Sequence, residues 1–199
     1  MTELAKGAAT KDAVLDQAVR IAGRLGLSGL TIGTLASATG MSKSGLFAHF
    51  GAKEALQLQV LARARDEFAD RVLRPAIRAP RGEPRVRALF ENWLEVGTEP
   101  GGPCLFASAG MEFDDQPGVV RDQVIRDHTD FAEAVQQIFR TGISEGQFRP
   151  DADDVQFQHD LLGIMLAVFH SFRLLGDAQS QLRARTAFER LLDAVRLPA

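Results

Sequence analysis

Hydrophobic residues recur along this chain at the three- and four-residue spacing of amphipathic helices, and no useful stretch alternates as a strand does. The first such stripe consists of Val14, Ala18, Ala22 and Leu25. Thr10 is a suitable N-cap for this helix, and Gly26 suits the position just beyond its end. The pattern predicts an all-α protein.

Two short helices are predicted next, each with its own capping residue. Thr31 can cap a helix over residues 32–39, and Ser42 can cap another over residues 43–50. Gly40 lies in the turn between them, so the pair has the size and the tight glycine turn of a helix-turn-helix. The residues expected to face inward are Ile32, Leu35, Ala36, Met41, Leu46 and Phe50.

The remainder of the chain is also predicted to be helical. A long helix opens at Lys53 and should stop at Pro75, and a loop follows over residues 79–84. The later helices are expected at about 85–98, 104–113, 119–145, 152–175 and 178–197. Asp151 is the expected N-cap of the helix over 152–175, which is apolar on most sides. Such a helix must be buried on most sides, and a second subunit is an economical cover.

Composition places this 199-residue chain among ordinary globular proteins, with 45% hydrophobic and 25% charged residues. The single cysteine excludes an internal disulfide framework and fits a reducing compartment. No apolar run reaches the length of a membrane span, and the first ten residues lack the apolar centre of a secretory signal, so a cytoplasmic protein is expected. The net charge is −3, but residues 1–53 carry +3 and the rest −6, which suggests an anionic partner for the first quarter.

The helix over 43–50 has the dimensions of a helix that reads DNA. Eight residues rise about 12 Å, comparable with the width of the B-DNA major groove. Ser44, Phe47 and Ala48 share its outward face at positions i, i+3 and i+4. Ser44 can hydrogen-bond a base edge, whereas Phe47 and Ala48 can contact a thymine methyl group. We therefore expect these three residues to read bases, with part of the specificity coming from DNA shape.

Contacts to the DNA backbone are expected around this face. Gly45 permits close approach to the duplex. The residues placed to meet phosphates are Lys43, His49 and Lys53 on the rim, and Thr31 and Ser42 at helix N-termini, where free N–H groups and the helix dipole favour anions.

The ordered set of residues from about Thr10 to Leu56 resembles the DNA-binding domain of the TetR (tetracycline repressor) family. The matching residues are Thr31, Ile32, Ala36, Gly40, Ser42, Lys43, Leu46, His49, Phe50, Lys53, Glu54 and Leu56. One departure is Phe47, where the family usually has a tyrosine. A phosphate contact through a tyrosine hydroxyl is therefore not available here, so either the affinity for DNA is lower or Ser44 and His49 compensate.

The resemblance implies a homodimeric transcriptional regulator, usually a repressor. Residues 1–53 would bind a pseudo-palindromic operator in double-stranded DNA, and residues 54–199 would bind a small-molecule effector and dimerise through the last two helices. Effector binding would move the fourth helix and spread the two recognition helices of the dimer. An activator, or a regulator without an effector, is the alternative within this class.

Apolar side chains of the second domain could line an effector cavity or form a plain core. These residues are Phe90, Trp93, Phe106, Met111, Phe131, Met165 and Phe169. They favour an apolar or aromatic effector. Cys104, at the expected start of a helix, could be a thiol sensor within the same site or a buried apolar residue.

Metal binding and catalysis find little support in the sequence. His159 and His170 fall on nearly the same helix face and could bind a metal with His128 or Glu112, but no pair at i, i+4 exists. No Ser-His-Asp set, phosphate-binding glycine loop or metalloprotease motif is present. We therefore predict no metal, no cofactor and no enzymatic activity. The alternative from another class is a helical small-molecule-binding or thiol-dependent enzyme with a vestigial helix-turn-helix.

Overall fold

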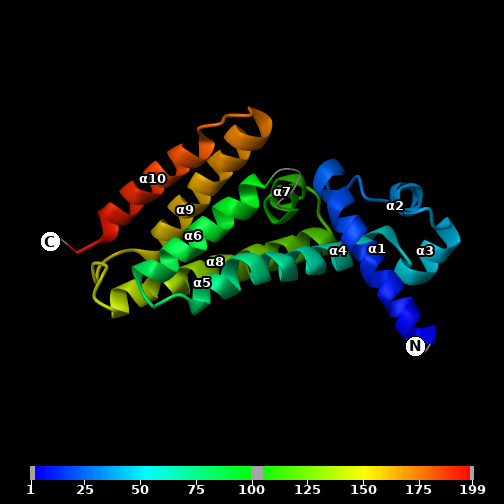
Figure 1. Cartoon of the computed structure of the whole chain (residues 1–199), viewed down its shortest axis with the longest axis horizontal. Helices are drawn as coiled ribbons and strands as arrows, with labels where there is room; N and C mark the ends of the chain where they lie inside the picture. The colour runs from blue at the N-terminus through cyan, green and yellow to red at the C-terminus, as the bar shows by residue number, and fades with distance from the viewer. Residues whose placement is uncertain (1–2, 100–104, 198–199) are drawn as a thin grey trace. The chain divides into compact units, whose positions relative to one another are not determined.

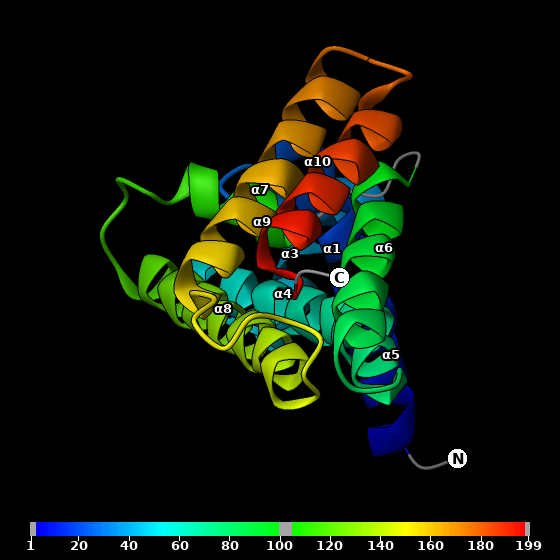
Figure 2. The ribbon, with the colours of Figure 1, turned by 90° about the vertical axis from the view of Figure 1, so that its left-hand side faces the viewer.

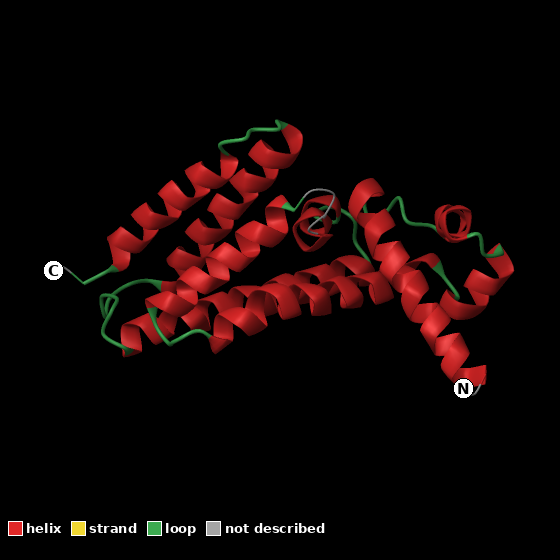
Figure 3. Ribbon diagram, in the orientation of Figure 1, coloured by secondary structure: helices red, strands yellow, loops and turns green. Residues whose placement is uncertain are grey.

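The computed structural model describes residues 3–99 and 105–197, with side-chain surroundings from residue 11 onwards. Within this part of the chain the structure consists of helices joined by turns and loops (Figure 3), which confirms the all-α prediction. The described residues include no strand, only an isolated antiparallel bridge between Phe148 and Arg196. In the same residues, no helix combines the length and the apolar character needed to cross a membrane.

The chain divides into two compact units. The first contains the described residues up to Phe68 and those from 105 to 128, and the second contains residues 69–99 and 129–197. This is a division by packing, whereas the boundary at residue 53 was predicted for function and stays a prediction.

The first unit is built on a hydrophobic core to which all of its helices contribute. Its elements are α1 (Glu3–Leu25), α2 (Ile32–Thr39), α3 (Lys43–Phe50), α4 (Lys53–Phe68), α7 (Leu105–Glu112) and the first part of α8 (Val119–Ser144). Leu35, Leu46 and Phe50 are buried in this core, and Ile32, Ala36 and Met41 pack against it, as the sequence predicted. Burial of each large apolar side chain contributes about 1.5–3 kcal/mol, so the core holds α2 and α3 in place.

The start of α1 differs from the prediction. The helix begins at Glu3 and runs through Thr10, so Thr10 is not its N-cap. The preceding segment is rich in alanine, the residue with the highest helix propensity, and the helix extends into it. The end of α1 agrees with the prediction, because Gly26 has a φ of 81°, a left-handed conformation that favours glycine.

The second unit is an assembly of longer helices. Its elements are η1 (Ala69–Leu73), α5 (Arg74–Arg78), α6 (Glu83–Thr98), the rest of α8, α9 (Asp154–Val168), η2 (Phe169–Leu174) and α10 (Ser180–Val195). Helices α9 and α10 run side by side, as Figure 1 and the turned view in Figure 2 both show.

Proline does not act as the helix stop that the sequence suggested. The helical path continues beyond Phe68 through the wide π-helical turn η1 and passes Pro75 into α5, ending at Arg78. Likewise, α6 begins at Glu83, so Pro84 lies inside the helix rather than in the preceding loop. Pro84 occupies the first turn of α6, where the missing N–H would have no intrahelical acceptor, whereas Pro75 is the second residue of α5 and directly follows the π-helical turn.

The helix predicted over 152–175 also has different ends. Asp153, not Asp151, is the N-cap of α9, since its Oδ1 accepts hydrogen bonds from the N–H groups of Val155 and Gln156 at 2.9 and 3.0 Å. A turn closed by the Ala152 N–H on the Arg149 carbonyl (3.1 Å) occupies the preceding residues. At the other end, the α-helical pattern stops at Val168 and widens into the π-helical segment η2.

Stacked aromatic rings form the centre of the second unit. Phe139 stacks against both Phe148 and Phe157, with ring centroids 4.9 and 4.3 Å apart. Phe90 and Phe188 stack at 4.0 Å, which joins α6 to α10. Such pairs contribute about 0.5–1.5 kcal/mol beyond the burial of their area.

Charged residues spaced by four positions on α6 reinforce its contact with the C-terminal helix. The Arg87 Nη2 donates to the Glu189 Oε2 at 2.8 Å, and the Arg196 Nη2 donates to the Glu83 Oε1 at 2.6 Å. Arg87 also bonds Glu83 within α6 at 2.7 Å. A further pair joins Glu91 to Arg185 at 2.8 Å. In this network the two arginines, Arg87 and Arg196, donate charge-assisted hydrogen bonds to the two carboxylates, Glu83 and Glu189.

We expect Glu83→Gln to lower the free energy of unfolding near neutral pH and to remove part of the acid sensitivity of the protein. The hydrogen bond from Arg196, with a further one from Arg87, lowers the pKa of Glu83 from 4.5 to about 2. Because the folded-state pKa lies below the unfolded one, the stabilisation is present above pH 4.5 and is lost as the pH falls toward 2. Since both arginines are partly exposed, about 1–2 kcal/mol is expected at neutral pH.

Urea unfolding of the wild type and Glu83→Gln, at one protein concentration and several pH values, measures this effect. The difference between the two proteins should shrink across that acid window. Glu145→Gln, in an exposed pair with Arg81, is the control and should change stability little. A difference that stays constant down to the lowest pH would contradict the role of the Glu83 charge.

Candidate nucleic-acid interface and pocket of the first unit

Local hydrogen bonds cap helices α2 and α3 and define where each begins. Thr31 and Thr34 form a capping box, in which each backbone N–H donates to the hydroxyl of the other residue at 2.9 and 3.0 Å. Ser42 caps α3, accepting from the Gly45 N–H at 3.1 Å. Between the two helices, Gly40 has a φ of 69°. These features confirm the predicted helix-turn-helix residue by residue.

The outward face of α3 consists of the three residues predicted to read bases. Ser44, Phe47 and Ala48 are all exposed, and Phe47 exposes 61% of its surface. The Phe47 ring is therefore accessible for contact with a bound surface. The Ser44 hydroxyl lies 3.2 Å from that of Ser42, within hydrogen-bonding distance.

The residues predicted to meet phosphates surround this face. Lys43 and Lys53 are exposed at the first residues of α3 and α4, and His49 is half-buried in the last turn of α3. The hydroxyls of Thr31 and Ser42 serve the helix caps, so these residues offer the N-termini of α2 and α3 rather than free side chains. Sequence reasoning did not single out Lys11, whose Nζ lies 5.8 Å from the centroid of the Phe50 ring, because α1 reaches α3 only through the fold.

The residues predicted to bind an effector fall into three groups. Phe106 lies in the first unit, and Met111 lies there too but exposes 59% of its surface. Cys104 lies outside the described residues. The remaining five belong to the second unit, where four are buried and one is half-buried: Phe90, Trp93, Phe131, Met165 and Phe169. Trp93 meets Phe131 edge to face at 4.9 Å.

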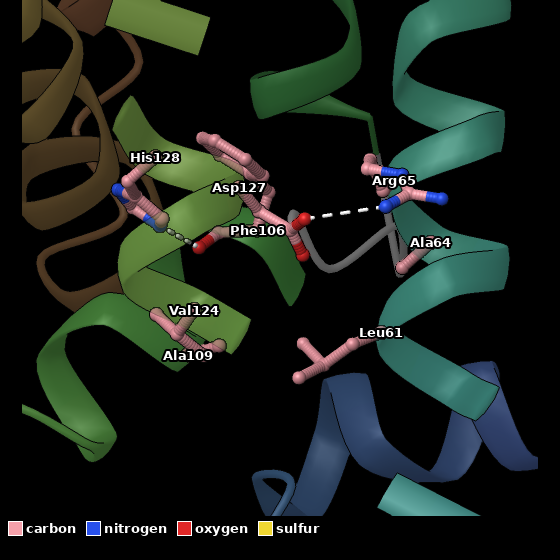
Figure 4. A pocket seen from close by; sticks show the side chains of 8 residues that line it. All are labelled: Leu61, Ala64, Arg65, Phe106, Ala109, Val124, Asp127 and His128. Carbon is pink, nitrogen blue, oxygen red and sulfur yellow. Dashed lines mark hydrogen bonds and ion pairs between the residues drawn. The ribbon is translucent and has the colours of Figure 1, made fainter. Parts of the chain in front are cut away.

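A pocket in the first unit lies between α4, α7 and the first part of α8 (Figure 4). Its cavity volume is about 10 Å³. Its lining residues are Leu61, Ala64, Arg65, Phe106, Ala109, Val124, Asp127 and His128. Of the residues predicted to bind an effector, Phe106 lines this pocket. That volume is roughly the room for one water molecule, so a ligand must push the pocket walls apart to enter.

Three polar residues of the pocket are arranged by hydrogen bonds. The Asp127 Oδ1 accepts from Gln123 Nε2 at 2.8 Å and from Arg65 Nη1 at 3.4 Å, although Asp127 is only 5% exposed. His128 Nε2 lies 2.9 Å from the carbonyl oxygen of Phe106, and the two rings stack at 4.2 Å. Burial lowers the pKa of His128. The ring is therefore neutral near neutral pH, with its proton on Nε2, because a carbonyl oxygen can only accept.

Sequence reasoning missed Arg65 and Asp127. Their side chains meet across 62 positions of sequence, which no helical periodicity can reveal. The available signal was the position of Asp127, one turn after Val124 on the apolar side of the helix. A carboxylate expected to be buried there indicates a charged partner, because buried carboxylates are rare without one. His128 and Glu112, considered as metal ligands, have other contacts, and no cluster of three metal-binding side chains occurs among the described residues.

Comparisons of the sequence place both halves of the chain in one family. The pattern described as "Bacterial regulatory proteins, tetR family" matches residues 14–60. The pattern described as "Tetracyclin repressor-like, C-terminal domain" matches residues 82–188. No curated protein matches the chain.

Three solved structures with the same fold cover 80–97% of the chain. A TetR transcriptional regulator from Chloroflexus aurantiacus J-10-FL is 24% identical, with a TM-score of 0.85 over 97% of this chain and 99% of that one. AibR, solved with isovaleryl coenzyme A and operator DNA, is 23% identical, with a TM-score of 0.68 over 80% of this chain and 85% of its own. A regulator from Saccharomonospora viridis, solved with choline, is 18% identical, with a TM-score of 0.77 over 96% and 100% of the chains.

Members of this family are generally DNA-binding proteins without enzymatic activity. The two family matches, together with the capped helix-turn-helix, favour a regulator over an enzyme with a vestigial motif. The chain therefore belongs to the tetR family of bacterial regulatory proteins and is a DNA-binding transcriptional regulator.

Proposed function

We propose that this protein binds a pseudo-palindromic operator as a homodimer through α3 and is released from it by a small molecule. The observation that carries the proposal is the exposed face of Ser44, Phe47 and Ala48, presented by a helix whose two ends are capped and whose other side is buried. A rigid helix with an exposed face suits insertion into a major groove, because its side chains need little ordering on binding.

Each residue of the interface has a distinct role in the proposal. Ser44 hydrogen-bonds a base edge, and Phe47 and Ala48 contact thymine methyl groups. The phosphate contacts come from Lys43, Lys53 and His49, and from the backbone N–H groups at the helix starts marked by Thr31 and Ser42. Gly45 leaves room for close approach, since it carries no side chain at the surface of α3.

Dimerisation through α9 and α10 fits the apolar surface that these helices leave uncovered in one chain. The exposed apolar residues of this region, here called the α9–α10 face, are Val155, Leu174, Leu175 and Leu182. Leu162 and Leu166 are only half-buried, although the sequence predicts burial around most of this helix. A second copy would cover these residues, and each buried leucine contributes about 1.5–3 kcal/mol.

The effector is proposed to occupy the pocket that Phe106 helps to line. Its walls are mainly apolar, which supports an apolar or aromatic body of small size. The Asp127 carboxylate and the carboxylate of Asp66 share the single cation of Arg65, so the polar group of the ligand should be a hydrogen-bond donor. Isovaleryl coenzyme A and choline, bound by two regulators of this fold, differ too much in chemistry to identify the effector here. The residues predicted in the second unit form an alternative location for the effector.

The proposal places the protein in the cytoplasm with its DNA and assigns it no catalytic role.

Selection of random duplex DNA by the purified, ligand-free protein at moderate salt tests the proposal. The expected result is an enriched pseudo-palindrome, whose two half-sites report the separation of the α3 helices in the dimer. Sedimentation of the complex at increasing protein concentration gives the stoichiometry. Failure of a folded protein to enrich any sequence would contradict the proposed operator binding.

A further inference from the structure

The loop between α1 and α2 is held by side chains from two other helices of the first unit. On one side, the carboxylate of Glu112 in α7 accepts from the N–H groups of Leu27 and Ser28 at 2.7 and 2.6 Å. On the other side, the Nε2 of Gln57 in α4 donates to the Leu27 carbonyl at 2.8 Å. Side chains thus bind both the N–H and the carbonyl of Leu27. The two residues that do so, Glu112 and Gln57, are here called the Leu27 clamp.

The surroundings leave the clamp little freedom. Gln57 is only 3% exposed, and the Leu27 side chain is fully buried. A Cβ atom at Gly26 would lie 2.8 Å from the Glu112 Oε1, so the carboxylate fills the space beside that glycine. A displacement of Glu112 must either move the loop or leave the N–H groups of Leu27 and Ser28 without their acceptor, which is costly. A displacement of Gln57 leaves its own buried amide without the Leu27 carbonyl, which itself keeps a bond from the Leu30 N–H at 3.2 Å.

The two clamp residues lie on the same helices that line the pocket. In α7, Phe106 and Ala109 line the pocket, and Glu112 follows Ala109 by one turn. In α4, Gln57 precedes the pocket residue Leu61 by one turn. Since each helix is short and continuous, a shift of its pocket side carries its clamp residue along. The loop that receives this shift runs directly into Thr31, the cap of α2.

We propose that Glu112 and Gln57 are the positioning residues through which occupation of this pocket changes the placement of the helix-turn-helix. The inference rests on the proposed function, in which the pocket is the effector site. An occupant that separates α7 from α4 pulls the two sides of the Leu27 clamp apart. The loop between α1 and α2 then moves with either α4 or α7. As a result α2 and α3 leave their DNA-binding position, and the affinity for the operator falls.

A covalent occupant tests this without knowledge of the natural effector. Ala64 lines the pocket and is half-buried, so Ala64→Cys in a Cys104→Ser background provides one thiol at the pocket. Benzyl methanethiosulfonate attaches a benzylthio group to it through a disulfide, releasing methanesulfinate, and a thiol reductant removes the group. Affinity for the selected duplex is measured before labelling, after labelling and after reduction, so each protein is its own reference.

With the clamp intact, labelling should weaken binding by about tenfold or more, and reduction should restore it. In the Glu112→Ala and Gln57→Met backgrounds the ratio of affinities before and after labelling should fall below about twofold, whatever the starting affinity. A purely structural role of these residues would alter the starting affinity and leave that ratio unchanged. Glu112→Gln, which keeps the size of the side chain, serves if the alanine variant does not fold. Asp115→Cys, exposed in the loop before α8, is the labelling control and should show no response.

Two results would overturn the inference. One is an equal response to labelling in every background, which would show that the signal bypasses the clamp, for example through α4 alone. The other is no response with the clamp intact, which would show that the pocket is not coupled to α3. Failure of the proposed function is distinguishable, because it would show as absent operator binding by the unlabelled wild type.

Discussion

The double variant Lys43→Ala/Lys53→Ala is expected to bind every duplex about a thousandfold more weakly than the wild type at about 0.15 M salt. Both lysines are exposed at helix starts beside the α3 face, and each is proposed to neutralise one phosphate. A dimer therefore loses about four contacts, each worth about fivefold at that salt concentration. The slope of log affinity against log salt should become shallower by about 3.6.

Fluorescence anisotropy with the selected duplex and a scrambled one, at several salt concentrations, measures both quantities. The control is Arg78→Ala/Arg126→Ala, which removes the same charge from exposed positions outside the helix-turn-helix. Its effect should be small at physiological salt, because charges distant from the DNA are screened. Weaker binding of the selected duplex alone would contradict the assignment, since phosphate contacts carry no direct sequence information.

The second large effect concerns stability: Gly142→Ala is expected to lower the free energy of unfolding by about 2–4 kcal/mol. A Cβ atom at this position in α8 would lie 2.2 Å from the Cδ2 of Phe148. That ring cannot retreat easily, because it is buried and stacked on Phe139. Its backbone is also tied to the end of α10, where the neighbouring Arg149 N–H donates to the Val195 carbonyl at 2.8 Å.

Thermal unfolding at fixed protein concentration checks this expectation, with a fall in Tm of about 4–16 °C. Gly97→Ala is the matched control in a helix of the same unit. There the new methyl group would meet Met165 and Phe169 at 3.6 and 3.7 Å, an ordinary contact distance. The control should be neutral or slightly stabilising, since alanine favours a helix over glycine. Equal losses in the two variants would show that the cost is not the contact with Phe148.

The helix-turn-helix could be predicted closely because its signals are local. Thr31 and Ser42 accept hydrogen bonds from N–H groups three residues away, and Gly40 adopts a left-handed conformation that strains other residues. The positions of these caps and of this turn therefore depend only on neighbouring residues. The exposed face of α3 followed from the same periodicity, once Leu46 and Phe50 were assigned inward.

Errors arose where two local choices competed. Asp151 and Asp153 can both cap a helix, and the turn that the Ala152 N–H closes selects Asp153. Pro75 can end a helix or open one, and the π-helical turn before it allows the second outcome. In each case the deciding contact lies in geometry that periodicity does not encode.

The sequence by itself determined the fold class, the caps of α2 and α3, the residues on the α3 face and the family of regulators to which the chain belongs. Only the tertiary structure decided where Phe106 points, which partners Asp127 has, and that Glu112 and Gln57 hold Leu27. The physical reason is sequence separation. Caps and periodic faces are set within about one or two helical turns. The Glu112 bond to the Leu27 N–H instead joins residues 85 positions apart, and it exists only because the core of the first unit brings α7 against the loop between α1 and α2.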